Sequence, residues 1–573
     1  MRLLGNLPLI ALVALTACVS VAEAPAAGQR TGSSDSASPK EERTLRMVTR
    51  AEPASIAGTI LIPTGITTGT QRRLFNAGLV LKDGDGKYRP YLAETAPQLN
   101  TDSWRVLPDG RMETTYRLRP GLVWQDGTPL SAQDFAFAWR VYSSPQFGVS
   151  RSLPHSAMQD IVVNDDRTLV IRWRDIYFEA GNLESTDFAP LPRHVLEAPF
   201  AQDVTTFDSL PFWTTEYVGA GPYRLDRWEP GAFIEARAFT QHVLGAPNID
   251  RLRITWNSDF NANLASLLAT EADLPIDDSI RVEQGLTLDR DWTTRGAGSV
   301  RYRPQLPRFI QVQHRAEYAD PPAVRDVRVR QALTHAIDKA SINETLFEGK
   351  GLTSDSLIYP TVDYFAAVDR AAAKYPFDLR RSDQLLSEAG FSRDTEGSYT
   401  DARAARVNLE LRNIQSAQND AERSIIADGW RRAGFQLTED VFTPSQTRNG
   451  ELLGTFRSLS ITSAAADTTG LNVEDYTCAR ASRPETRWFG QNRGGWCNTD
   501  YDYVMGRLTL ALDPKERGEL VAEAIGALTS DLGIIPLHFN PGVVAVPAQL
   551  QGPNVKVPDA DLSWNVHEWR LSQ

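Results

Sequence analysis

Residues 111–142 constrain the fold of this chain more than any other stretch, because they hold a strand, a turn and a capped helix in close succession. An alternating strand pattern and the turn sequence Asp-Gly-Thr-Pro precede Ser131. Ser131 stands three residues before Asp134, which is the spacing of a helix capping box. Three aromatic residues then follow at helical spacing: Phe135, Trp139 and Tyr142. We expect this aromatic stripe to be buried in a large core.

Composition narrows the class of protein. The chain has 573 residues, 42% of them hydrophobic and 23% charged. This length and composition indicate roughly three to four globular units. The net charge of −12 argues against a nucleic-acid partner, because binding to a polyanion relies on a basic surface.

The first 18 residues predict export. Arg2 gives the positive start, residues 7–15 form a short apolar run, and Leu-Thr-Ala-Cys ends the segment. The run is too short for a comfortable transmembrane helix. The ending resembles the lipobox of bacterial lipoproteins, which implies that Cys18 is lipidated and becomes the mature N-terminus. An ordinary secretory peptide cut nearby is the alternative. Residues 19–43 have the composition of a flexible tether.

Three cysteines are an odd number for an exported protein, but lipidation of Cys18 leaves Cys478 and Cys497 as a pair. A disulfide between them would stabilise their loop by about 3 kcal/mol. Two free buried thiols, or half of a metal site, are the alternatives. No other Cys and no nearby His cluster complete a metal set, so we predict no metal site.

The second half of the chain alternates helices and strands, which favours an α/β lobe. Asp326 is placed to cap a regular helix. Residues 341–344 have the pattern of a capping box, which predicts that the next helix starts there. Two later helices end in Ala-Gly-Phe, at residues 389–391 and 433–435. Glycine suits the left-handed position after the last turn, and the Phe can fold back onto the helix.

Several blocks, in consistent order from residue 45 to the C-terminus, resemble the peptide-type solute-binding proteins of bacterial ABC transporters (extracellular solute-binding protein family 5, with oligopeptide-, dipeptide- and nickel-binding members). The blocks are Tyr-Leu-Ala-Glu at 91–94, Leu-Arg-Pro-Gly at 118–121, Trp-Gln-Asp-Gly-Thr-Pro-Leu at 124–130, Gly-Ala-Gly-Pro-Tyr at 219–223, Asp-Val-Arg-Val-Arg-Gln-Ala-Leu at 326–333 with Ala-Ile-Asp at 336–338, Leu-Leu-Ser-Glu-Ala-Gly-Phe at 385–391 and Ile-Pro-Leu at 535–537.

The resemblance implies an α/β, two-lobed periplasmic-binding-protein fold (Venus flytrap, type II) with an extra third domain. It implies the following division: lobe 1 at 44–80, 205–305 and 530–573, domain II at 81–204, and lobe 2 (domain III) at 306–529.

The implied function is capture of a solute. A monomeric lipoprotein, anchored through Cys18 outside the cytoplasmic membrane, would bind oligo- or dipeptides in a cleft between the lobes and deliver them to ABC permease subunits. No cofactor is implied. A nickel complex, a sugar or an opine remains an alternative ligand, and a sensor without a permease is an alternative role.

The resemblance also suggests which residues bind the ligand. Peptide-binding members place an Asp after small residues in the third domain, and Asp467 after Ala-Ala-Ala is the matching position. This chain departs from the family pattern afterwards, with Thr-Thr-Gly at 468–470. Four residues near the cysteine pair are further candidates for side-chain pockets or carboxylate binding: Trp488, Trp496, Arg487 and Arg493.

Catalytic motifs are missing from the sequence. It contains no Gly-x-Ser-x-Gly elbow, no Walker A loop and no His-Glu-x-x-His, and its seven histidines are scattered. A pair of carboxylates in a glycosidase arrangement stays open among the 72 Asp and Glu. We predict that the protein is not an enzyme and has no catalytic residues.

Overall fold

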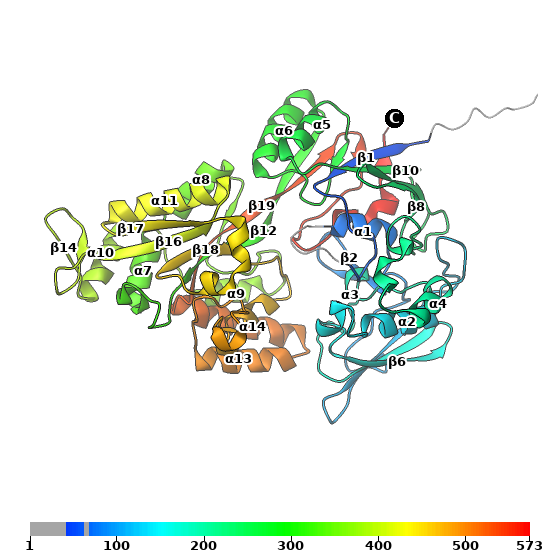
Figure 1. Ribbon diagram of the computed structural model, residues 1–573, viewed down its shortest axis with the longest axis horizontal. Coiled ribbons are helices and arrows are strands. Elements are labelled where there is room, and N and C mark those ends of the chain that lie inside the picture. The colour runs from blue at the N-terminus through cyan, green and yellow to red at the C-terminus, as the bar shows by residue number, and fades with distance from the viewer. Residues whose placement is uncertain (1–41, 62–67, 573) are drawn as a thin grey trace, which may run out of the picture. The chain divides into compact units, whose positions relative to one another are not determined.

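Three large sheets, with helices packed on them, organise the described residues, 42–61 and 68–572, of this computed structural model (Figure 1). The predicted signal peptide, Cys18 and nearly all of the predicted tether lie outside the described residues. Among the helices that are described, none combines the length and apolarity of a membrane span.

The first sheet belongs to the segments predicted as lobe 1 and has the strand order β11-β1-β10-β9-β8. Strand β1 is parallel to β10 and β11, whereas β8, β9 and β10 pair in antiparallel fashion. Leu45 and Met47, two residues apart on β1, are fully buried, as the period of a strand dictates. The elements are β1 (Thr44–Thr49), β8 (Tyr223–Glu229), β9 (Phe233–Ala238), β10 (Arg251–Trp256), β11 (Leu274–Pro275), α1 (Gly69–Phe75), α5 (Phe260–Leu268) and α6 (Val282–Arg295).

Domain II is an antiparallel sheet of order β4-β5-β7-β6 with helices beside it. The predicted capping box is confirmed, because the Ser131 N–H donates to Asp134 Oδ2 at 2.8 Å. Phe135 and Tyr142 are fully buried as predicted, whereas Trp139 is half-buried. The elements are β4 (Trp104–Val106), β5 (Met112–Arg117), β6 (Met158–Asp165), β7 (Thr168–Trp173), α2 (Ala132–Tyr142), α3 (Ser185–Phe188), α4 (Arg193–Gln202) and the hairpin β2 (Val80–Lys82) with β3 (Tyr88–Pro90).

Lobe 1 and domain II share one hydrophobic core. Met47 of β1, Phe135 of α2 and Ile171 of β7 belong to the same buried cluster. The glycine-rich turn before β8 packs tightly against α1, since a Cβ added at Gly221 would lie 2.3 Å from the carbonyl carbon of Phe75. A glycine is therefore required where these two segments meet.

Lobe 2 is built on a mixed sheet of order β13-β19-β12-β18-β16-β17. Helices cover both of its faces. The strands are β12 (Gly298–Val312), β13 (Leu352–Thr353), β16 (Asn408–Ile414), β17 (Gln436–Phe442), β18 (Leu459–Ser463) and β19 (Ile534–Pro547). The helices are α7 (Val327–His335), α8 (Lys339–Phe347), α9 (Phe365–Ala371), α10 (Leu379–Glu388), α11 (Ala417–Ala433), α12 (Gly450–Gly454), α13 (Thr499–Leu510) and α14 (Pro514–Ser530). Short ladders complete the described fold: β14 (Ser392–Arg393) with β15 (Tyr399–Thr400), and β20 (Leu550–Gln551) with β21 (Arg570–Leu571).

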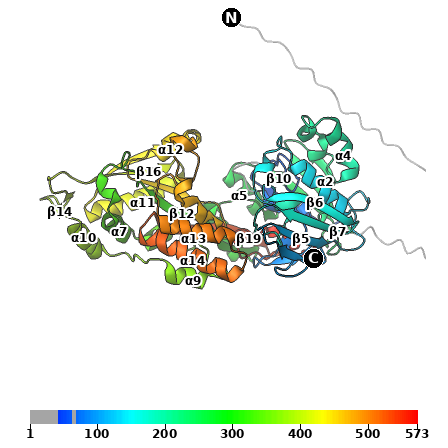
Figure 2. The same ribbon diagram turned by 90° about the horizontal axis from the view of Figure 1, so that it is seen from below.

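Neighbouring residues of the central strands pack in two separate hydrophobic cores of lobe 2. Ile310 and Ile535 lie in a cluster with α7, α10 and α11, whereas Phe309 and Ile534 lie in a cluster with α9, α13 and α14. Figure 2 shows α9, α13 and α14 together on their side of the sheet. The alternation of a strand thus divides the apolar residues between the two faces.

The helix ends of lobe 2 follow the sequence signals with one exception. Gly390 and Gly434 have φ of 90° and 102°, and the N–H groups of the following Phe residues bond back to the last turn, as predicted. The predicted start of a helix at a 341–344 capping box is wrong. Helix α8 begins at Lys339, because Asp338 accepts the Ser341 N–H at 3.0 Å and acts as the cap.

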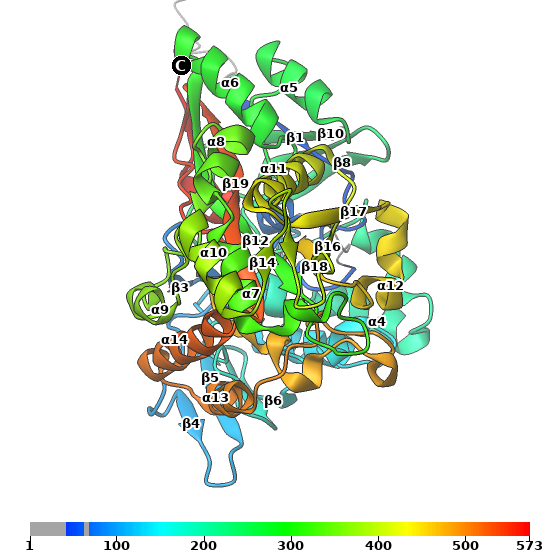
Figure 3. The same ribbon diagram turned by 90° about the vertical axis from the view of Figure 1, so that its left-hand side faces the viewer.

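Two long strands, β12 and β19, link the lobes (Figure 1), and we call them the connecting strands. Figure 3 shows them side by side. They pair from Gly298–Pro547 to Gln311–Ile534, and the register is irregular between residues 304 and 307 and between 308 and 309. Val544 and Val546 belong to the lobe 1 core, whereas Ile535 belongs to lobe 2. The lobe boundary predicted at 305/306 thus falls inside a continuous strand.

Candidate functional site

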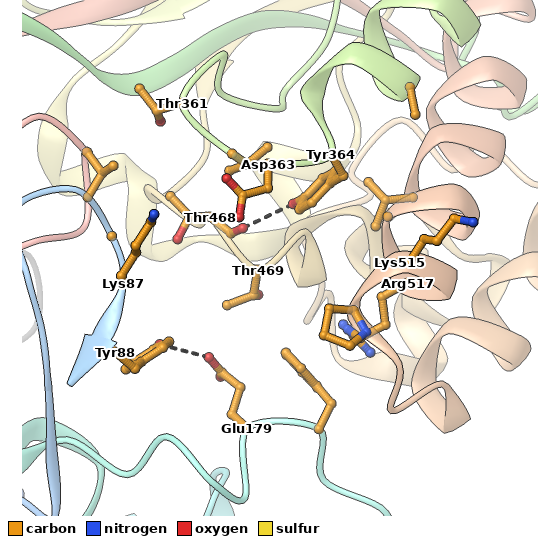
Figure 4. Close-up of a pocket in the computed structure, with 18 of the residues that line it drawn as sticks. Lys87, Tyr88, Glu179, Thr361, Asp363, Tyr364, Thr468, Thr469, Lys515 and Arg517 are labelled. Carbon is orange, nitrogen blue, oxygen red and sulfur yellow. Dashed lines mark hydrogen bonds between the residues drawn. The ribbon is translucent and has the colours of Figure 1, made fainter. Parts of the chain in front are cut away.

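A cavity of about 790 Å³ lies between domain II, with Val557 of lobe 1, on one side and helices and loops of lobe 2 on the other. Its volume is within the range of small-ligand sites in proteins. Its walls come from stretches far apart in the sequence: residues 82–88, 178–182, 361–370, 468–469 and 512–521, with Val557. Figure 4 shows that side chains from these stretches converge on the same space.

The domain II wall carries a carboxylate held by phenol groups. Tyr88 donates its hydroxyl to Glu179 Oε1 at 3.1 Å (Figure 4), and Tyr177 donates to Oε2 at 3.4 Å. Burial raises the pKa of Glu179, and the nearby charge of Lys82 and the Tyr88 hydrogen bond offset this only in part. The wall therefore presents a carboxylate in a partly dehydrated setting.

The lobe 2 wall carries a guanidinium and hydroxyl groups. Arg517 donates Nη1 to the carbonyls of Leu508 and Ala511, at 2.8 and 3.1 Å, which fixes the turn between α13 and α14. Its guanidinium carbon lies 3.4 Å from the ring centroid of Phe178, a residue of the opposite wall. Tyr364 donates its hydroxyl to the Thr468 carbonyl at 3.0 Å (Figure 4). The two walls therefore meet at a cation–π stack.

Lys82 also lines the cavity, but it is buried and paired with Asp559, whereas the remaining charged residues lie at exposed positions. They include both signs of charge: Lys87, Asp363, Arg370 and Lys515. Exposed charges of this kind interact weakly with a ligand because water and salt screen them. The buried walls therefore dominate recognition.

Asp467 lies next to this cavity, and its neighbours Thr468 and Thr469 line it. Its Oδ1 accepts the N–H and the hydroxyl of Thr469, at 2.8 and 2.6 Å, and its Oδ2 accepts the Asn472 N–H at 2.7 Å. Asp467 also raises the pKa of Tyr364 after burial, so its charge reaches the cavity. In this structure the carboxylate orders its own loop, and its role as an amino anchor stays a prediction.

The other four predicted ligand residues do not line this cavity. Trp496 is only 2% exposed, donates its indole N–H to Asp531 Oδ2 at 2.6 Å and packs in the lobe 2 core. Trp488 is half-buried against Tyr318. Arg487 is exposed, and Arg493 is half-buried, donating to Gln491 Oε1 at 3.4 Å. The rings of Trp488 and Trp496 pack against other residues of lobe 2. Because Trp is common both in cores and in ligand sites, residue type alone does not separate these two roles.

Cys478 and Cys497 are joined by a disulfide in the structure. Within the part of the chain that the structure describes, no group of three or more His, Cys, Asp or Glu is arranged to hold a metal ion. Sequence reasoning missed the cavity residues Tyr88, Glu179 and Arg517. Each stands in an ordinary local pattern, and only the fold brings them together.

Comparisons with known proteins agree with this architecture. Residues 94–468 match the family described as "Bacterial extracellular solute-binding proteins, family 5 Middle". The oligopeptide-binding protein AppA of Bacillus subtilis (strain 168) is 23% identical over 506 residues, covering 84% of this chain and 86% of AppA.

Two solved structures share the fold at 19% identity. NikZ from Campylobacter jejuni in complex with Ni(L-His) has a TM-score of 0.69 and covers 92% of this chain and 99% of its own. The oligopeptide-binding protein from Thermus thermophilus with a pentapeptide has a TM-score of 0.66 and covers 92% of this chain and 96% of its own. The two-lobed α/β fold and the family match lead to one conclusion: this chain belongs to the bacterial extracellular solute-binding proteins, family 5.

Proposed function

We propose that this protein captures peptides in the cavity between its lobes and delivers them to the permease of an ABC transporter. The observation that carries the proposal is the cavity itself, whose walls come from domain II, with Val557 of lobe 1, and from lobe 2 of a solute-binding fold. A ligand that contacts both walls favours the arrangement in which both are close, so binding and lobe closure are coupled. The relative AppA is named for oligopeptide binding, which supports the choice of ligand.

The chemistry of the walls suits a peptide. A peptide brings charged ends and main-chain amides that lose water on binding, and each needs a polar partner. Glu179 and Tyr88 on one wall, and Thr468 and Thr469 on the other, offer such partners. Phe178 and Tyr364 add aromatic surface for side chains.

Lobe motion would take place along the connecting strands. Their pairing is irregular near residues 304–309, where a ladder is weakest. Within this stretch, Glu422 of α11 binds a cross-strand pair: Arg308 Nη2 donates to its Oε2, and His538 Nε2 lies 2.9 Å from its Oε1. This buried cluster attaches the connecting strands to lobe 2. We propose that it marks the lobe 2 end of the hinge.

The protein would be anchored to the membrane by a lipid. Lipidation at Cys18 and a tether at residues 19–43 would hold the receptor near its permease outside the cytoplasmic membrane. Mass spectrometry of the N-terminal peptide from the membrane fraction tests this step. A diacylglycerol-modified Cys18 is expected, whereas cleavage that leaves no lipid on Cys18 would exclude lipid anchoring.

Isothermal titration calorimetry tests ligand class. Purified protein is titrated with defined tri- to nonapeptides and, in parallel, with Ni(L-His) and simple sugars. We expect dissociation constants of about 1 μM or tighter for some peptides, or about −8 kcal/mol of binding free energy. Binding of a non-peptide solute with no response to any peptide would contradict the proposal. Unchanged peptide affinity in Asp467→Ala would remove Asp467 as the amino anchor.

A further inference from the structure

Within the described part of the chain, Glu179 lacks a cationic partner, unlike two other carboxylates near it. Glu184 pairs with Arg73 at 2.8 Å, and Asp559 pairs with Lys82 at 2.7 Å. Among the described residues, no Lys, Arg or His nitrogen lies within the 4.0 Å of an ion pair from the Glu179 carboxylate. Its hydrogen-bond partners are the hydroxyls of two tyrosines. A half-buried carboxylate without a counter-charge is destabilising, so Glu179 is available to a cation from outside the chain.

The loop holds Glu179 firmly in the cavity wall. Its backbone is fixed by the Ala180 N–H bond to the Tyr177 carbonyl at 3.1 Å and by the Asn182 N–H bond to the Glu179 carbonyl at 2.8 Å. Figure 4 shows the side chain directed into the cavity, with Tyr88 beside it. The carboxylate is thus positioned without any ligand.

The charges around Glu179 also favour a cation. Asp187, Glu184 and Asp467 are close enough to interact with it or with one another, and burial with the charges of Glu184 and Glu179 raises the pKa of Asp187 to about 7. Lys82, a cation whose charge acts on Glu179, is bound by Asp559.

Lys87 of this wall is exposed, and a further cation, Arg517, lies across the cavity. It uses Nη1 for backbone carbonyls and stacks on Phe178, which leaves it outside ion-pair distance of Glu179. The acids of this wall therefore outnumber the cations free to balance them.

We propose that Glu179, with the Tyr88 hydroxyl, is the subsite for a positively charged group of the bound solute: the terminal ammonium of a peptide or a basic side chain. This rests on the proposed peptide function and adds a specificity to it. An ammonium or guanidinium there would form charge-assisted hydrogen bonds with the free lone pairs of both Glu179 oxygens. The ligand's cationic end would then lie on the domain II wall, opposite the loop of Asp467.

The test uses the full chain and an equimolar mixture of random pentapeptides as the probe. Retained peptides are identified by mass spectrometry, and the best-retained sequence is made again in two altered forms. N-acetylation removes its terminal charge, and replacement of Lys or Arg by norleucine removes its side-chain charges. Calorimetry then compares all forms on the wild type and on Glu179→Gln, which keeps an acceptor for Tyr88.

On the wild type, we expect one of the two neutralised forms to bind about 10- to 100-fold more weakly. Glu179→Gln should weaken the parent peptide by a similar factor and should no longer distinguish the neutralised form. The form that shows the effect identifies the source of the charge. Glu179→Asp keeps the charge and should still bind the parent peptide more tightly than the neutralised form. This variant shows whether the effect of Glu179→Gln comes from the lost charge or from misfolding.

Asp363→Asn is the matched control, because Asp363 is an exposed carboxylate in the same cavity. It should leave the discrimination unchanged. The subsite alone would be overturned if the wild type and Glu179→Gln distinguished the parent peptide from its neutralised form equally well. It would also be overturned if Glu179→Gln and Asp363→Asn lost the same amount of peptide affinity. Retention of no pentapeptide by the wild type would overturn the proposed function and the subsite with it.

Discussion

Replacing Glu422 by Gln is expected to weaken lobe 2 where the connecting strands enter it. Glu422 is 0% exposed and lies between the guanidinium of Arg308 and the imidazole of His538. The Gln variant keeps the size of the side chain and removes the negative charge. Arg308 is only 6% exposed, and in the variant it has lost its counter-ion. A buried charge without a counter-ion destabilises the folded state.

The size of the effect follows from the pKa of the carboxyl. Burial raises this pKa, but the Arg308 charge and the His538 hydrogen bond outweigh it and lower the pKa from 4.5 to about 2. That change corresponds to about 3 kcal/mol of folding free energy at pH 7, at about 1.4 kcal/mol per pH unit. Because the folded-state pKa is the lower one, this stabilisation is present above pH 4.5 and is lost as the pH falls toward 2. At pH 3 about 1.5 kcal/mol remains.

Urea unfolding followed by circular dichroism at pH 7 and pH 3 measures this difference. We expect the wild type to exceed Glu422→Gln by about 3 kcal/mol at pH 7 and by about half of that at pH 3. Glu439→Gln is the control, since Glu439 also binds two arginines but is partly exposed, and it should cost less than about 1 kcal/mol. A difference that is near zero at pH 7, or equal at both pH values, would refute the reasoning.

Three further predictions concern other parts of the structure. Phe178→Ala removes the ring stacked on a guanidinium across the cavity and should weaken peptide binding by about 3- to 10-fold in calorimetry; unchanged affinity would show that the stack does not help hold the walls together. Gly221→Ala should lower the free energy of unfolding by about 2–3 kcal/mol, because its Cβ would meet backbone at 2.3 Å; Gly148→Ala, with open space around it, should change little, and equal effects would contradict the packing argument. Replacing Cys478 and Cys497 by Ser opens a loop of sequence separation 19 and should cost about 3 kcal/mol in urea unfolding, whereas no loss would mean that the loop is ordered without the bond.

Local structure was predictable where a few neighbouring residues carry the whole signal. The Ser131–Asp134 capping box and the Gly-Phe helix ends at 390–391 and 434–435 are of this kind, because their hydrogen bonds close within a single turn. The start of α8 was misplaced because two capping residues, Asp338 and Ser341, compete within one turn and their hydrogen bonds decide between them.

The cavity was not predictable in the same way. Tyr88, Glu179 and Thr468 come from distant segments, and none belongs to a motif. The lack of a cation at Glu179 depends on where Lys82 makes its own ion pair, which is a tertiary property. Trp496 shows the converse, since a residue type common in ligand sites here fills a core.

Native mass spectrometry of the protein purified under mild conditions tests the central claim most directly. Our account predicts a protein mass increased by a bound ligand that, after denaturation, fragments as a peptide, carrying a positively charged group. A released non-peptide molecule, such as a metal chelate or a sugar, would contradict peptide capture as the function.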